Sequence, residues 1–64
     1  MTTLHDVQAA YQEGRRQAQV TTTVRLRYAE RRIRRQQGQL THAERAFHEA
    51  LCDELRFRGI EVTG

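Results

Sequence analysis

LTHAERAFHEALCDELRFRG, residues 40–59, contains the strongest helix signal in the chain. The Thr41 side chain can accept from the backbone N–H of Glu44 while the Glu44 carboxylate accepts from that of Thr41, which makes a capping box. Apolar residues then recur at helical spacing on one face: Ala43, Ala46, Phe47, Ala50, Leu51 and Leu55. Gly59 can terminate the helix. The stretch therefore predicts an amphipathic helix over 42–58.

A second helix is expected near the start of the chain, over about 4–18. Its narrow apolar stripe consists of Leu4, Val7, Tyr11 and Ala18. Thr3 can serve as its N-cap. Gly14 lies on the same stripe and marks either a close helix crossing or a weak helix end.

The middle of the chain, residues 20–37, is compatible with two structures. Residues 20–28 alternate between apolar and polar side chains and are rich in β-branched residues, a pattern typical of a strand. Thr23 could instead cap a helix that begins at Val24. We expect an extended segment or short strand at 20–27, and then a helix over 28–37 that ends at Gly38.

The predicted fold class is mainly α, a single small domain over 1–64 with two to three helices and a C-terminal helical hairpin. One short strand is allowed at 20–27, and Ile60 and Val62 could form another beside it. A chain this short buries only about 60% of the surface that its unfolded form exposes. Because Cys52 is the single cysteine, no internal disulfide can stabilise the domain. We therefore expect the chain to form a homo-oligomer, in the simplest case a homodimer, or to be a subunit of a larger complex.

Charge is distributed unevenly along the chain. Residues 20–40 carry six arginines and one acid, Glu30, for a charge of +5, whereas residues 41–64 carry three arginines and five acids, for −2. Glu54 lies on the apolar face of the predicted 42–58 helix and needs a cationic partner if it is buried. The arginines of the middle segment are candidates for that partner.

The central arginines are the candidate binding residues: Arg25, Arg27, Arg31, Arg32, Arg34 and Arg35. One explanation for them is neutralisation by acids of the same chain or of another subunit. We favour the function of a small non-enzymatic, nucleic-acid-binding accessory or regulatory protein. These arginines would contact the phosphates of the nucleic acid, which we expect to be DNA. The alternative is an adaptor or inhibitor that docks the same surface on an acidic protein. No apolar run is long enough for a membrane span, and the cytoplasm is the expected location.

At the level of a strand followed by two helices, the chain is similar to ribbon-helix-helix regulators. TVRL at 23–26 resembles their DNA-reading strand, and AFHEAL at 46–51 resembles part of their second helix. The resemblance implies that Thr23, Arg25 and Arg27 face the major groove from a paired ribbon. It covers roughly half of the chain, and the span from Leu26 to Gly38 is shorter than the first helix of that family.

Sequence features for a metal or catalytic site are few. His48 and Cys52 are four residues apart and could touch one metal ion. No second pair occurs, and His5 or His42 would have to be brought in by folding or symmetry. Both His48 and Cys52 are expected on the polar side of their helix. We therefore predict no metal site, no cofactor and no enzymatic activity.

Overall fold

The computed structural model describes residues 4–62. Its elements are α1 (Leu4–Gln19), α2 (Thr23–Arg34), the 3₁₀ turn η1 (Gln37–Gln39) and α3 (His42–Phe57). The predicted mainly helical fold is confirmed. No strand occurs within residues 4–62, so the strand allowed at 20–27 does not form. The DNA-reading strand implied by the ribbon-helix-helix resemblance is therefore wrong, because Thr23, Arg25 and Arg27 lie on α2.

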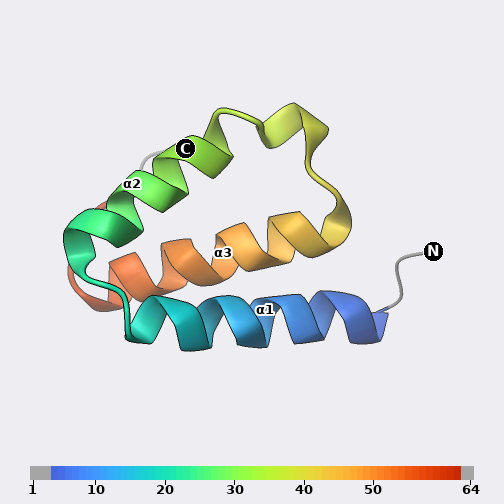
Figure 1. The fold of residues 1–64 in the computed structure, drawn as a ribbon, viewed down its shortest axis with the longest axis horizontal. Coiled ribbons are helices and arrows are strands. Elements are labelled where there is room, and N and C mark those ends of the chain that lie inside the picture. Colours follow the sequence, from blue (N-terminus) through green and yellow to red (C-terminus); the bar gives the residue numbers. More distant parts are fainter. Residues whose placement is uncertain (1–3, 63–64) are drawn as a thin grey trace.

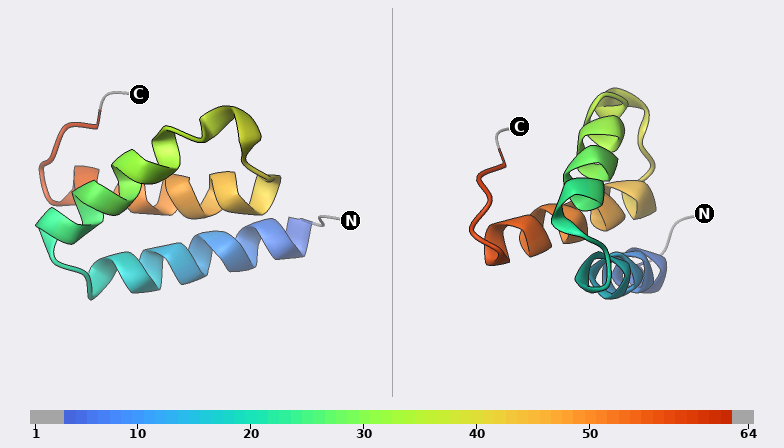
Figure 2. Two further views of the ribbon diagram at one scale, coloured as in Figure 1. Left: turned by 45° about the horizontal axis from the view of Figure 1, so that its top comes forward. Right: turned by 60° about the vertical axis from the view of Figure 1, so that its left-hand side comes forward.

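α1 and α3 form one layer of the molecule, and α2 forms the other. In Figure 1, α1 and α3 lie side by side and run in the same direction, while α2 returns in the opposite direction. α2 is close to the other helices at its beginning and moves away from α3 toward its end. Figure 2 shows that α2 stands off the α1/α3 layer, so one side of this helix faces away from the body of the protein.

Gly14 lies at a close crossing of α1 and α3. A Cβ atom added there would be 2.8 Å from the Cβ of Ala50 and 3.0 Å from the backbone oxygen of Phe47. Of the two explanations for this glycine, the close crossing is the one confirmed. The buried core next to it draws on all three helices, through Ala18, Leu26, Leu51 and Leu55.

α2 begins earlier than expected, and its cap is Thr22 rather than Thr23. The Thr22 hydroxyl accepts from the backbone N–H of Arg25 over 3.4 Å. Leu26 is buried and Ile33 packs against the same core two turns later, whereas Val24 is 79% exposed. A strand would place Val24 and Leu26 on the same face, whereas the helix places them on opposite sides.

α3 begins at the predicted residue and ends at Phe57, one residue before the predicted end, because both ends depend on local hydrogen bonds. The capping box is complete, with the Thr41 N–H 2.9 Å from a Glu44 carboxylate oxygen and the Glu44 N–H 3.1 Å from the Thr41 hydroxyl. At the other end Gly59 adopts a φ of +83°, and the N–H of Ile60 donates to the carbonyl of Leu55 over 2.9 Å. This pattern is a Schellman motif, in which glycine has no Cβ penalty.

Two smaller expectations about loops were wrong. Gly38 does not follow the cap of α2, because that helix ends at Arg34 and Gly38 lies inside the η1 turn without a positive φ. Ile60 and Val62 pack against the core as irregular chain instead of forming a strand. No helix within residues 4–62 is long and apolar enough to cross a lipid bilayer.

Candidate nucleic-acid interface

The side of α2 that faces away from the core combines arginines with two apolar residues. At about 100° per residue, it lies opposite Leu26 and Ile33. We call this surface the outer face of α2; it consists of Val24, Arg27, Tyr28, Arg31, Arg32 and Arg35, with Arg25 at its edge. All seven residues are exposed. Sequence reasoning located the arginines but not the start of the helix at Thr23, which places Arg25 and Arg27 on the same element as the others.

Five of the six candidate arginines have no carboxylate within ion-pair distance in the part of the chain described. They are Arg25, Arg27, Arg31, Arg32 and Arg35. The Arg32 guanidinium instead lies over the ring of Tyr28, 5.8 Å from its centre, in a cation–π contact. The outer face is therefore an uncompensated positive surface.

Arg34 is the exception among the six. Its side chain is half-buried, and its Nε atom lies 3.5 Å from Oε2 of the buried Glu30. This i,i+4 pair within α2 neutralises one member of the cluster. Arg34 thus belongs to the inner side of the helix.

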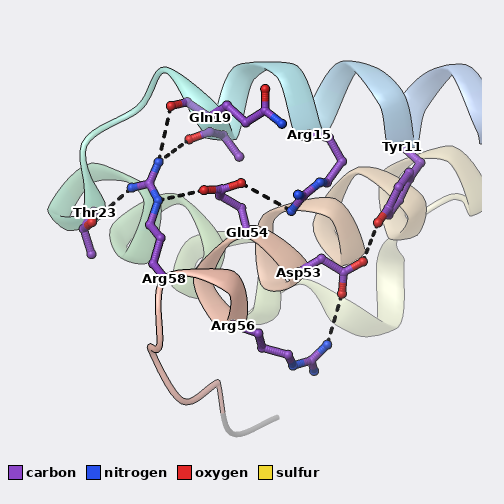
Figure 3. Close-up of polar contacts among 9 residues, drawn as sticks. Tyr11, Arg15, Gln19, Thr23, Asp53, Glu54, Arg56 and Arg58 are labelled. Carbon is purple, nitrogen blue, oxygen red and sulfur yellow. Dashed lines mark hydrogen bonds and ion pairs between the residues drawn. The ribbon is translucent and has the colours of Figure 1, made fainter.

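Two acids of α3, Asp53 and Glu54, have their partners outside the arginine cluster, as Figure 3 shows. Glu54 is buried, with Arg15 Nη1 3.4 Å from its Oε1 and Arg58 Nε 2.9 Å from its Oε2. Asp53 accepts from the hydroxyl of Tyr11 over 2.5 Å and from Arg56 over 3.2 Å. The expectation that α2 supplies the partner of Glu54 was therefore wrong: α1 and α3 supply it.

Arg58 is a structural residue that sequence reasoning missed. Its guanidinium donates to the backbone carbonyl of Ala18 over 2.7 Å and to the hydroxyl of Thr23 over 3.0 Å, in addition to its bond with Glu54. It thereby joins the end of α1, the first residue of α2 and the end of α3. The available signal was an arginine four residues after an acid on an apolar face.

A second polar cluster joins α2 to α3. Nε2 of His48 lies 2.9 Å from Oε2 of Glu30 and 3.6 Å from Sγ of Cys52. Cys52 is 4% exposed, so its expected place on the polar side of the helix was wrong. Burial, and secondarily the charge of Glu30, raises the pKa of the Cys52 thiol to about 11. Sequence reasoning did not place Glu30 beside His48 and Cys52, although Glu30 lies four residues after Leu26 on the buried face of α2.

Comparison with protein families, curated proteins and solved structures finds no match for this chain. Function must therefore be argued from these surfaces. The outer face of α2 has the charge and the accessibility of a binding surface. The Glu30 cluster has the chemistry of a ligand set.

Proposed function

We propose that this protein binds duplex DNA through the outer face of α2, as a small non-enzymatic accessory or regulatory protein of the cytoplasm. The observation that carries the proposal is the set of five exposed arginines without a carboxylate partner in residues 4–62. Arg27, Arg31 and Arg35 follow each other at intervals of four, and each such pair of like charges costs a few tenths of a kcal/mol in a helix, roughly 0.2–0.5. A polyanion that contacts the helix removes this repulsion.

The dimensions of α2 suit the major groove of DNA. The helix has 12 residues and is therefore about 18 Å long. The groove is about 12 Å wide and admits an α-helix. Arg27 and Arg31 lie on one flank of the outer face and Arg32 on the other, so phosphates of both strands are within reach. Contacts of this kind position a protein without reading much sequence.

A salt-dependent titration tests the proposal. Fluorescence anisotropy is followed as protein is added to a labelled duplex and to a labelled single strand, at several salt concentrations. Five phosphate contacts predict a slope of log K against log salt of about −4.5 for the duplex. Absence of duplex binding at low salt would refute the proposal. Tighter binding of the single strand would refute its duplex form.

An acidic protein partner is the second candidate, and the apolar centre of the outer face favours it. Val24 is 79% exposed and Tyr28 is 63% exposed. Tyrosine and arginine are the residue types that most often dominate the energetics of protein interfaces. Under this proposal, a pulldown from nuclease-treated lysate retains one stoichiometric acidic protein, and the double variant Arg31→Glu, Arg35→Glu releases it. Retention by the double variant would exclude the outer face as the docking surface.

A further inference from the structure

Three side chains with metal-binding atoms converge where α2 crosses α3. Glu30 comes from α2, and His48 and Cys52 lie one turn apart on α3. The Glu30 carboxylate, the His48 imidazole and the Cys52 thiol place their ligand atoms within 4.8 Å of one another. Glu30 and Cys52 are buried, at 4% exposure each, and the His48 side chain is 14% exposed. The cluster is therefore largely shielded from water.

Hydrogen bonding to the His48 ring cannot engage the Glu30 carboxylate and the Cys52 thiol at the same time. Nε2 of His48 faces both Oε2 of Glu30 and Sγ of Cys52. If Nε2 carries a proton, it donates to the carboxylate, and the thiol has no acceptor on the ring. If Nε2 has no proton, it can accept from the thiol, but its lone pair then faces the lone pairs of the carboxylate. A cation between the three atoms would satisfy all of them at once.

We propose that Glu30, His48 and Cys52 bind one divalent transition-metal ion, with zinc as the best fit. Bonds of about 2.0–2.3 Å in a tetrahedral site place neighbouring ligand atoms about 3.3–3.7 Å apart. The separation of 3.6 Å between Nε2 and Sγ already matches this value. The separation of 2.9 Å between Nε2 and Oε2 is shorter than this value, so the Glu30 carboxylate has to move slightly to admit the ion.

The donor set also selects the class of metal. A thiolate and an imidazole favour zinc and similar soft or borderline ions over magnesium and calcium, which prefer oxygen ligands. The thiolate and the carboxylate together carry two negative charges, which balance those of a divalent ion. Arg34, 3.5 Å from Glu30 Oε2, then acts as the outer partner that orients the carboxylate. Three protein ligands leave a fourth position for water or another donor.

Cobalt(II) titration of untagged, reduced and chelator-treated protein tests the proposal without nucleic acid, so its result does not depend on the proposed function. We expect one cobalt ion per chain, with thiolate-to-cobalt charge transfer in the near ultraviolet and the intense visible bands of a tetrahedral site. Zinc should displace the cobalt stoichiometrically. Absence of the charge-transfer band at excess cobalt would overturn the proposal.

Variants identify the ligands. Cys52→Ser should abolish the charge-transfer band, and His48→Gln and Glu30→Gln should each weaken zinc binding by at least about tenfold. The control variants His5→Gln and His42→Gln alter histidines outside the cluster and should bind as the wild type does. Circular dichroism verifies that each variant is folded. Since Cys52→Ser changes one atom, unchanged metal affinity in that variant would overturn the site even if the Glu30 variant fails to fold.

Discussion

Glu54 and Arg58 lie four residues apart at the end of α3, with Arg58 Nε 2.9 Å from Glu54 Oε2, and this pair fastens all three helices together. The carboxylate is buried, and the same guanidinium reaches the last turn of α1 and the first residue of α2. Arg58, directly after α3, therefore contributes to the orientation of α2 and to the direction of its outer face, together with the packing of Leu26.

Replacing Arg58 by methionine should destabilise the fold strongly. Glu54 would keep only Arg15, and removing one partner of a buried pair costs about 3–5 kcal/mol. Urea unfolding followed by circular dichroism measures the loss. Arg56→Met is the matched control, because its pairs with Glu49 and Asp53 are at the surface and contribute about 1 kcal/mol or less. Equal losses of unfolding free energy in both variants would show that Arg58 does not have a special role in joining the three helices.

Gly14→Ala should also lower the free energy of unfolding. Alanine gains about 1 kcal/mol of helix propensity, but its methyl group would be 2.8 Å from the Cβ of Ala50, so α1 and α3 must separate. Overpacking of this kind costs about 1–3 kcal/mol. Gly38→Ala is the control, because no atom lies within 4 Å of a Cβ there and its φ is not positive. A Gly14→Ala variant that is more stable than the wild type would contradict the close crossing.

The double variant Arg31→Gln, Arg35→Gln should weaken DNA binding and reduce the salt slope by about 2. The control, Arg16→Gln with Arg45→Gln, removes the same two charges from a formal net charge of +3. It should change binding less, because Arg16 pairs with Glu13 on α1 and Arg45 lies on α3. Equal effects of the two double variants would mean that total charge, and not the outer face of α2, governs binding.

Stability should fall with acid partly through the capping box of α3. Hydrogen bonding to the backbone N–H of Thr41 holds the pKa of Glu44 below its usual value of 4.5. A carboxyl group whose pKa is lowered by folding stabilises the protein above that usual value and loses this contribution as the pH falls through the folded pKa. Comparing urea unfolding at pH 7 and pH 3 measures it. Glu44→Gln should lose less stability over the same interval, and an identical loss would exclude Glu44 as a contributor.

Light scattering should find a dimer, with twice the chain mass of 7.5 kDa. Large apolar side chains at Leu4, Val20 and Phe57 are 74%, 84% and 82% exposed in the single chain. A domain of 64 residues buries a smaller fraction of its surface on folding than a larger domain does, so covering exposed apolar side chains in a dimer should stabilise it. A folded monomer at micromolar concentration would contradict the expected homodimer.

The elements that could be predicted from sequence are those whose ends are capped by hydrogen bonds between residues close in sequence. Thr41, Glu44 and Gly59 specify α3 through hydrogen bonds to residues at most five positions away. The start of α2 was not predictable in the same way. It depends on Leu26 reaching a core made by α1 and α3, and on Arg58 bonding Thr23 across 35 positions. A period of two over a few residues could not reveal those contacts.

The same distinction between local and distant contacts applies to the candidate sites. The arginines at 25–35 were visible in the sequence, but the outer face was not, because Arg25 and Arg27 were expected on an extended segment. Arg34 pairs with Glu30, and Glu30 contacts His48. Both contacts depend on which face of α2 is buried. That choice requires the position of α3.

The parallel course of α1 and α3 also bears on how the chain acquires its structure. Their contact at Gly14 and Ala50 closes a loop that contains all of α2, so the central packing is distant in sequence. Contacts of long sequence separation slow folding, because the entropy of loop closure is lost before they form. A chain emerging from the ribosome cannot pack its first helix against its final partner until the third helix has been synthesised, so α1 must wait for α3.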